Sequence, residues 1–165
     1  IYFYSTKIVD SGLGEFFVAV KGSMIVIGTF YIQSGEVNIE SILAGIVIGT
    51  LSSLVLFIAS FPDHDADKSK GRKTLVITVG KEKARKLFWI FPLFAYGVIV
   101  IGVVLNHFPV FTLISLMSFP LIIKSGIGLQ KNYDSVENLV PYMSSTLKFS
   151  RLTGILFVIS FLIPL

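Results

Sequence analysis

The chain has 165 residues, of which 53% are hydrophobic, and its mean hydropathy is +0.82. Soluble domains of this length need a polar surface and rarely average so apolar, so the composition favours a membrane protein. The sequence contains no cysteine, which excludes disulfides, thiolate metal sites and cysteine nucleophiles within it. The formal net charge is +4, and its distribution along the chain is more informative than its size.

Five apolar blocks predict membrane-spanning helices. In chain order they cover residues 16–32, 42–61, 87–105, 108–127 and 147–165. Each is close to the roughly 20 residues that a helix needs to cross about 30 Å of hydrocarbon. The blocks are too continuous for the alternating pattern of barrel strands, so we expect an all-α, polytopic transmembrane helical bundle with five spans. The fifth block is continuously apolar only from Leu152, which leaves its start open.

The lysine and arginine residues gather on one side of this five-span arrangement. The predicted loop of residues 62–86 holds Lys68, Lys70, Arg72, Lys73, Lys81, Lys83, Arg85 and Lys86. The same side receives Lys7, Lys124, Lys131, Lys148 and Arg151. The connection Ser34–Ser41 on the other side carries only the acids Glu36 and Glu40. By the positive-inside rule, we expect a multi-pass protein of the cell membrane with its basic loops in the cytoplasm.

Lys21 is the one exception to this segregation, because it lies within the first apolar block. Its long side chain could snorkel back to the cytoplasmic headgroups, which would make it part of the orientation signal. It could instead face the interior of the bundle beside Gly22 and Ser23, where a charge indicates a functional role. The sequence leaves both interpretations open.

The loop after the second apolar block concentrates acidic residues, because Asp63, Asp65 and Asp67 alternate directly after Phe61 and Pro62. If the helix continues or restarts there, Asp63 and Asp67 share one face and Asp65 points elsewhere, since residues four apart are neighbours on a helix. Two carboxylates on one face, without cysteine or a suitable histidine pair, favour a hard cation such as Mg²⁺. This ion usually combines one or two carboxylates with water and substrate phosphates.

Cations follow these acids at once. Lys68, Lys70, Arg72 and Lys73 surround Gly71, which allows a turn or a close approach of the backbone. Lysine offers a point charge to phosphate and arginine a planar fork, so acids beside bases are the layout expected for a metal–diphosphate group. A basic loop by itself is also an ordinary orientation signal.

Two other interpretations of the acids compete with a metal site. A calcium-binding loop needs glycine at its sixth position and glutamate at its twelfth, where Lys68 and Thr74 stand, so we reject it. Helix capping by Asp63 would satisfy amides at a helix start but leaves Asp67 unexplained. Glu15, near another predicted helix start, is interpreted as a capping carboxylate rather than a catalytic one.

Around this loop the sequence resembles the UbiA-type superfamily of membrane prenyltransferases. The second aspartate motif of that family is Asp-x-x-x-Asp followed by a basic residue, a glycine and Lys-x-Thr-Leu. Residues 63–75 read Asp-His-Asp-Ala-Asp-Lys-Ser-Lys-Gly-Arg-Lys-Thr-Leu. A second patch, Gly-Leu-Gly-Glu at 12–15 and Gly-Thr-Phe-Tyr-Ile-Gln-Ser-Gly at 28–35, is most similar to the branch that prenylates 1,4-dihydroxy-2-naphthoate in menaquinone synthesis. The resemblance implies that residues 1–165 are the C-terminal part of one transmembrane prenyltransferase domain, helices five to nine of a nine-helix fold.

The resemblance also implies the site and the chemistry. Asp63 and Asp67 would be the catalytic pair that holds Mg²⁺, and the first aspartate motif of the family would lie upstream of this chain. The residues that would bind diphosphate are Lys68, Arg72, Lys73, Tyr4 and Lys7. An allylic prenyl diphosphate would ionise and an aromatic acceptor would attack the carbocation, while the prenyl tail lies among the apolar helices. The expected partners are these two substrates and the lipid bilayer, with no nucleic acid.

Two departures from the family pattern bear on the acceptor. The usual Asn-Asn before the acidic motif reads Ala59-Ser60, and a usual Phe-Gly-Pro reads Lys21-Gly22-Ser23. Another UbiA-type prenyltransferase with a different acceptor therefore stays an alternative. A non-enzymatic transporter or assembly subunit with a basic loop is the second alternative. A phosphatidyl-alcohol phosphotransferase is disfavoured, because the Asp-Gly and Ala-Arg pattern of that family does not occur in the acid cluster.

Overall fold

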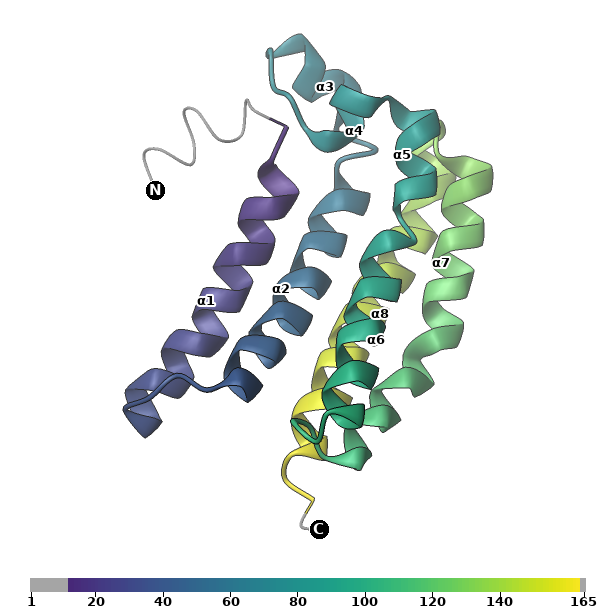
Figure 1. The fold of residues 1–165 in the computed structure, drawn as a ribbon. Coiled ribbons are helices and arrows are strands. Elements are labelled where there is room, and N and C mark those ends of the chain that lie inside the picture. The colour runs from purple at the N-terminus through teal and green to yellow at the C-terminus, as the bar shows by residue number, and fades with distance from the viewer. Residues whose placement is uncertain (1–11, 164–165) are drawn as a thin grey trace.

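A computed structural model describes residues 12–163, and every regular element among them is helical. The elements are α1 (Gly14–Ser34), α2 (Ile39–Ala59), α3 (His64–Ser69), α4 (Leu75–Val79), α5 (Lys81–Leu87), α6 (Ile90–Val104), the 3₁₀-helix η3 (Val110–Ser118), α7 (Phe119–Asn132) and α8 (Val136–Ser160). The long helices run side by side, and α3, α4 and α5 gather at one end of the bundle, here named the acidic-loop end (Figure 1). The predicted all-α bundle is confirmed.

Four stretches of the described chain are long and apolar enough to cross a membrane, namely Gly14–Ser34, Ile39–Ala59, Lys81–Val104 and Val110–Asn132. They coincide with the first four predicted blocks. The third begins at Lys81 rather than at residue 87, because α5 precedes α6 with only Phe88 and Trp89 between them. The predicted block began only at residue 87 because hydropathy excludes charged residues, and α5 is rich in lysine and arginine.

The fourth stretch contains a change of helix type. Its first part is the 3₁₀-helix η3, and α7 begins at Phe119 with Pro120 in its first turn. Proline lacks an N–H and has a fixed φ, so it suits the start of a helix and interrupts one that is already running. α7 then continues to Asn132, beyond the predicted end at residue 127.

The fifth predicted block, residues 147–165, overlaps the second half of α8, which begins at Val136, well before residue 147, and ends at Ser160. This helix is not among the four stretches that meet both length and apolarity. Lys148 and Arg151, which the charge analysis placed on the cytoplasmic side, lie inside α8 rather than in a connection between helices. α8 packs against α2, α7 and η3, and a helix with such neighbours tolerates polar residues that lipid would exclude.

A buried chain of hydroxyl groups joins α6, η3 and α8. The Tyr96 hydroxyl lies 2.8 Å from Ser118 Oγ, and Ser118 Oγ lies 2.6 Å from Thr153 Oγ1. All three residues are buried, and the Thr153 hydroxyl also donates to the carbonyl oxygen of Phe149. Because hydrocarbon offers no partner to a hydroxyl, such a network fixes the helices relative to one another.

The opposite end of the bundle carries one polar pair between distant segments. Nδ1 of His107, in the turn after α6, lies 2.8 Å from Oε1 of Glu40 in the first turn of α2. Both side chains are partly exposed, at 29% and 39%. This pair holds the α6–η3 turn against α2, far from the acidic loop (Figure 1).

Candidate functional site

The acidic loop is anchored where α2 ends. Phe61 is 1% exposed, and its ring meets that of Phe57 edge-on with 5.6 Å between the centroids. A turn over residues 60–63 then delivers the chain to α3. The core contact of Phe61 thus places the following carboxylates directly at the end of a membrane-length helix.

Asp63 and Asp67 lie on one helical turn, as their spacing indicates. The backbone N–H of Asp67 donates to the carbonyl oxygen of Asp63 at 2.8 Å. Asp63 occupies the N-cap position of α3, yet its side chain accepts no capping hydrogen bond. Its exposed carboxylate makes no ion pair or hydrogen bond with the part of the chain that the structure describes. Capping therefore does not explain this carboxylate, which remains available to a ligand.

The Asp65 carboxylate, unlike that of Asp63, already has partners in the protein. Its Oδ1 lies 2.7 Å from Nδ1 of His64, and its Oδ2 lies 3.8 Å from Nζ of Lys81. The hydrogen bond from His64, together with the positive charge of Lys81, lowers the pKa of the Asp65 carboxyl from its usual value. Its side chain is 85% exposed, whereas that of Asp67 is 15% exposed. The middle aspartate thus belongs to a separate set of contacts.

The turn that ends α3 directs the Arg72 side chain back toward Asp67. Gly71 has a φ of +75°, the left-handed conformation that glycine adopts without strain. The N–H of Arg72 donates to the carbonyl oxygen of Asp67 at 3.0 Å, and that of Gly71 to the carbonyl oxygen of Lys68 at 3.1 Å. These two bonds form a Schellman motif. The motif brings the Arg72 side chain back to its helix, where Nη1 lies 3.0 Å from Oδ1 of Asp67.

The Thr-Leu part of the motif starts the next helix. Oγ1 of Thr74 accepts a hydrogen bond from the N–H of Ile77 at 3.2 Å, so Thr74 caps α4. Val76 in this short helix is fully buried and ties the loop to the core. Lys68 and Lys73, on either side of the Schellman turn, are exposed and form no ion pair with another described residue. The loop therefore presents free cations around the Asp67–Arg72 pair.

The two patches of family resemblance meet in space. Gly12 has a φ of +77°, and a Cβ placed on it would lie 2.9 Å from Oγ1 of Thr78 and 3.6 Å from the carbonyl oxygen of Lys73. The glycine before α1 therefore lies directly against the loop that follows the acidic motif. Tyr4 and Lys7, both predicted to bind diphosphate, lie outside the described residues.

Lys81 is a loop residue whose contacts sequence reasoning missed. It was counted only as an orientation charge, but its side chain is 16% exposed and lies between two acids. Nζ is 3.8 Å from Asp65 and 3.6 Å from Oδ1 of Asp134, which lies between α7 and α8. No spacing in the sequence connects these residues, because the contact forms only when α5 and α7 come together.

Glu15 is also buried, with 4% of its surface exposed, and neither of its carboxylate oxygens has a hydrogen-bond partner among the described residues. It lines a cavity of about 280 Å³ that also includes Thr50, Ser53 and Leu75. Glu15 lies in the first turn of α1, but the interpretation as a capping carboxylate is not supported, because α1 has no side-chain cap and the Glu15 side chain turns toward α2 and α4.

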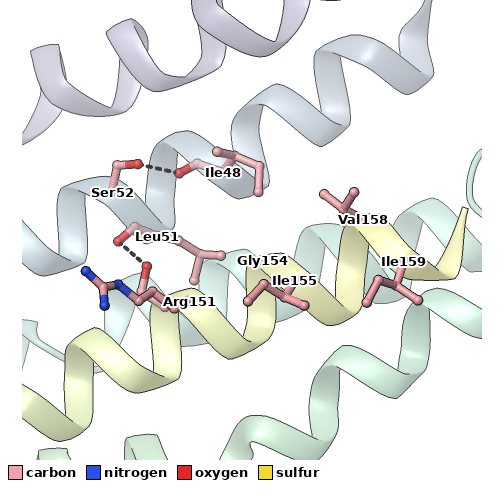
Figure 2. Close-up of a pocket in the computed structure, with 9 residues that line it drawn as sticks. Ile48, Leu51, Ser52, Arg151, Gly154, Ile155, Val158 and Ile159 are labelled. Atoms are coloured by element: carbon pink, nitrogen blue, oxygen red, sulfur yellow. Dashed lines mark hydrogen bonds between the residues drawn. The ribbon is translucent and has the colours of Figure 1, made fainter.

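A groove between α2 and α8 lies beneath the acidic-loop end. It encloses a cavity of about 440 Å³ lined by Ile48, Leu51, Ser52, Ser150, Arg151, Gly154, Ile155, Val158 and Ile159 (Figure 2). A smaller cavity of about 300 Å³ lies closer to the loop, and Ala59 lines it. A third, of about 700 Å³, adjoins at the opposite end and shares Ile48 and Val158 with the first. The α2–α8 groove thus runs along most of the bundle and is almost wholly apolar.

The two departures from the family pattern fall at distinct places. Ala59 faces the α2–α8 groove, whereas Ser60 is buried and its hydroxyl donates to the carbonyl oxygen of Leu56. Gly22 and Ser23 lie in the contact between α1 and α2, and Lys21 beside them is exposed and forms no ion pair with a described residue. Packing between helices therefore accounts for Gly22 and Ser23.

The donor set of the acidic loop fits magnesium. Within residues 12–163, no group of three or more His, Cys, Asp or Glu side chains could hold a metal ion. The chain offers the paired hard oxygens of Asp63 and Asp67, and Mg²⁺ characteristically accepts one or two carboxylates while water and substrate phosphates complete its shell. The carboxylates that are present match that demand, and the absence of cysteine disfavours metals that prefer thiolate ligands.

These features define a helical membrane protein of several spans with an acidic and basic loop at one end and an apolar groove between α2 and α8. The chain belongs to the UbiA prenyltransferase family, and a match to that family covers residues 1–161. The resemblance seen in the sequence is therefore confirmed.

Three curated relatives are similar to this chain. The 1,4-dihydroxy-2-naphthoate octaprenyltransferase of Escherichia coli (strain K12) is 30% identical over 152 residues, which cover 90% of this chain and 48% of that protein. The enzyme of the same name from Bacillus subtilis (strain 168) is 30% identical over 151 residues, 91% of this chain and 48% of that protein. The 2-carboxy-1,4-naphthoquinone phytyltransferase of a Synechocystis species is 23% identical over 110 residues, 66% of this chain and 36% of that protein.

The chain spans about half the length of the first two relatives. No solved structure matches it significantly.

Proposed function

We propose that the complete protein is a membrane prenyltransferase that transfers a prenyl group from an allylic prenyl diphosphate to an aromatic acceptor in a Mg²⁺-dependent reaction. Residues 1–165 then form the C-terminal part of one transmembrane prenyltransferase domain. The observation that carries this proposal is the pair of carboxylates on one helical turn, Asp63 and Asp67, with the guanidinium of Arg72 folded back onto the second. The carboxylates proposed to bind the metal and the guanidinium proposed to bind phosphate are thus in direct contact, through Asp67 and Arg72.

The proposed prenyl transfer depends mainly on electrostatic stabilisation of the leaving diphosphate. Ionisation of an allylic diphosphate builds negative charge on the leaving group, and positive groups positioned in advance lower that barrier. Mg²⁺ held by Asp63 and Asp67 would neutralise part of this charge. Arg72 offers two parallel N–H donors to phosphate oxygens, and the exposed Lys68 and Lys73 add point charges on either side.

Tyr4 and Lys7 complete the proposed diphosphate-binding set. They precede Gly12, which lies against Lys73 and Thr78, so a chain that continues from Gly12 starts beside the phosphate-binding loop. The aromatic hydroxyl and the ammonium group suit hydrogen bonding to phosphate oxygens.

The prenyl tail would lie among the apolar helices. The third cavity of the α2–α8 groove, about 700 Å³ in volume, has Val26, Phe30, Phe157 and Phe161 among its walls. Aromatic and aliphatic side chains of this kind can surround a long hydrocarbon chain through van der Waals contacts. The groove leads from the loop end toward this cavity, which suits a substrate with a polar head and a long apolar tail.

We propose 1,4-dihydroxy-2-naphthoate as the acceptor, which places the protein in menaquinone or related quinone biosynthesis. The names of the two 30% identical relatives support this acceptor. One observation favours a second acceptor within the same family, because Ala59 lines the groove where the family usually has asparagine. A different phenolic acid is therefore the alternative.

We further propose that the acidic-loop end faces the cytoplasm and that the protein resides in the cell membrane. α3, α4, α5 and the α7–α8 connection lie together at this end (Figure 1). Residues 62–86, which include α3, α4 and α5, carry eight of the 14 lysine and arginine residues, and the positive-inside rule places such segments in the cytoplasm.

The test is product formation by the complete protein in lipid vesicles. It should convert prenyl diphosphates of graded chain length and 1,4-dihydroxy-2-naphthoate into a prenylated product, and EDTA should stop the reaction until Mg²⁺ is added back. Consumption of 4-hydroxybenzoate in place of the naphthoate would identify the alternative acceptor. If no acceptor is prenylated in the presence of Mg²⁺, the proposed function is wrong.

A further inference from the structure

Arg151 lies at the depth of the middle of a membrane-length helix. It is about 22 Å along α8 from Val136, by the rise of 1.5 Å per residue. Its neighbour Ser150 donates its hydroxyl to the carbonyl oxygen of Leu51 at 3.3 Å, and Leu51 is near the centre of α2. α2 has the length and apolarity of a membrane span, so the backbone of Arg151 lies at hydrocarbon depth.

A charge at this depth indicates a function rather than a signal of orientation. Arginine within membrane helices is rare and costly, and it usually faces a cavity, a partner or a substrate pathway. Arg151 lines the α2–α8 groove and forms no ion pair with the residues that the structure describes. Figure 2 shows its guanidinium beside Leu51, extended toward the Ser52 side of the cavity and thus toward the end of α2 that leads into the acidic loop.

The walls around Arg151 combine apolar surface with two hydroxyl groups. Val158 of α8 points toward the side of Ile48 of α2, and Ile155 also lines the cavity. The hydroxyls of Ser52 and Ser150 both donate to backbone carbonyls, which leaves their oxygen lone pairs free to accept hydrogen bonds. A volume of about 440 Å³ is within the range of cavities that enclose small aromatic ligands.

We propose that Arg151 binds the carboxylate of an aromatic acid acceptor, whose ring lies in the α2–α8 groove. Guanidinium and carboxylate match as two parallel hydrogen bonds. Phenolic hydroxyl groups on the ring would donate to Ser52 or Ser150. Arg151 is then the residue that selects acceptors carrying a carboxylate, and the inference rests on the proposed prenyl transfer.

The experiment measures binding and turnover with the complete protein, wild type and Arg151→Gln. The two probes are 1,4-dihydroxy-2-naphthoate and its amide, which has the same shape but no negative charge. We expect Arg151→Gln to weaken binding of the acid by about tenfold or more, while the affinity for the amide and the KM for the prenyl diphosphate stay within about twofold. Lys148→Gln is the matched control, since Lys148 is an exposed cation on the same helix that does not line the groove.

Three results would overturn the inference. The first is an equal loss of affinity for the acid and the amide in Arg151→Gln, which would indicate a structural role such as pairing with another part of the protein. The second is an equal effect of Lys148→Gln, which would indicate a general effect of charge. The third needs no variant: wild-type protein that binds the amide as tightly as the acid does not recognise the carboxylate.

These outcomes are distinct from failure of the proposed function. Wild-type protein that prenylates no acceptor refutes prenyl transfer itself. Wild-type protein that prenylates the naphthoate but fails any of the three comparisons refutes only the role of Arg151.

Discussion

Gly22 and Gly49 meet where α1 crosses α2, and a Cβ added to Gly22 would lie only 2.8 Å from the Cα of Gly49. Gly45 and Gly49 form a Gly-x-x-x-Gly pair on α2, and the Ser23 hydroxyl of α1 donates to the carbonyl oxygen of Gly45 at 3.0 Å. Lipid tails are as apolar as leucine, so membrane helices associate through close packing and hydrogen bonds of this kind. α1, and with it the Gly12 contact on the acidic loop, depends on this crossing.

Gly49→Ala should therefore destabilise the protein. The added methyl group would meet the carbonyl oxygen of Ala19 and the hydroxyl of Ser23, and overpacking of this kind costs about 1–3 kcal/mol. We expect the melting temperature in detergent, followed by a fluorescence thermal shift, to fall by several degrees. Gly28→Ala on α1 is the control, because no atom lies within 4 Å of the added Cβ. Equal melting temperatures for the two variants would contradict the close approach.

The three aspartates of the loop should differ in importance. Asp63→Asn and Asp67→Asn should nearly abolish prenyl transfer, because they remove a proposed metal ligand. Asp65→Asn should be milder, since this carboxylate contacts His64 and Lys81 instead. The measurement is kcat at saturating substrates and Mg²⁺. Similar losses in all three variants would show that the pairing of Asp63 with Asp67 does not determine the metal site.

Arg72 should compete with metal for Asp67. Without substrate, its guanidinium neutralises the carboxylate that the metal needs, and diphosphate would draw it away. Arg72→Gln should therefore bind Mn²⁺ alone about three- to tenfold more tightly than wild type, as measured by electron paramagnetic resonance, and inorganic pyrophosphate more weakly. Lys70→Gln removes an exposed cation from the same loop and serves as the control. Unchanged Mn²⁺ affinity relative to that control would refute the competition.

Lys81→Met should make the acidic loop less well ordered, although Lys81 is not one of the residues proposed to bind substrate. Lys81 lies between Asp65 and Asp134, so its loss should raise the KM for prenyl diphosphate about two- to fivefold and leave kcat nearly unchanged. Lys83→Met on the same helix is the control, because Lys83 is exposed and forms no ion pair with a described residue. A large fall in kcat would instead place Lys81 in the chemistry.

The increase in KM caused by Lys81→Met should not depend on pH near neutrality. The contacts of Asp65 hold its pKa below the usual 3.8, so its stabilising ion pair is fully present above that value. The contribution is lost only as the pH falls through the lowered pKa of the folded protein. The ratio of KM values for Lys81→Met and wild type should therefore be constant between about pH 6 and 8, and a ratio that changes with pH would point to another group.

The orientation in the membrane can be tested with single cysteines, because this part of the protein has none. Ser69→Cys in α3 should react with an impermeant maleimide only from the cytoplasmic side, and Glu36→Cys in the α1–α2 connection only from the other. Both positions are exposed, so access does not depend on burial. Labelling of both from one side would contradict the proposed topology.

Local patterns in the sequence determined the helical class, the first four membrane-length helices and the spacing of Asp63 and Asp67. These features depend on neighbours along the chain, because hydropathy over about 20 residues defines a span and four residues define a helical turn. The bend at Gly71 is of the same kind, since only glycine adopts the left-handed conformation at little cost.

Only the tertiary structure decided which charges have partners and how deep they lie. Lys81 meets Asp134, His107 meets Glu40, and Arg151 enters the α2–α8 groove because helices distant in the sequence pack together. The fifth predicted block, residues 147–165, included Arg151, but an averaging window penalises every charge equally and does not say which side of the helix carries it. In the bundle, α2 and α8 together form an almost wholly apolar groove that Arg151 and two serines also line, and neither helix alone predicts that groove.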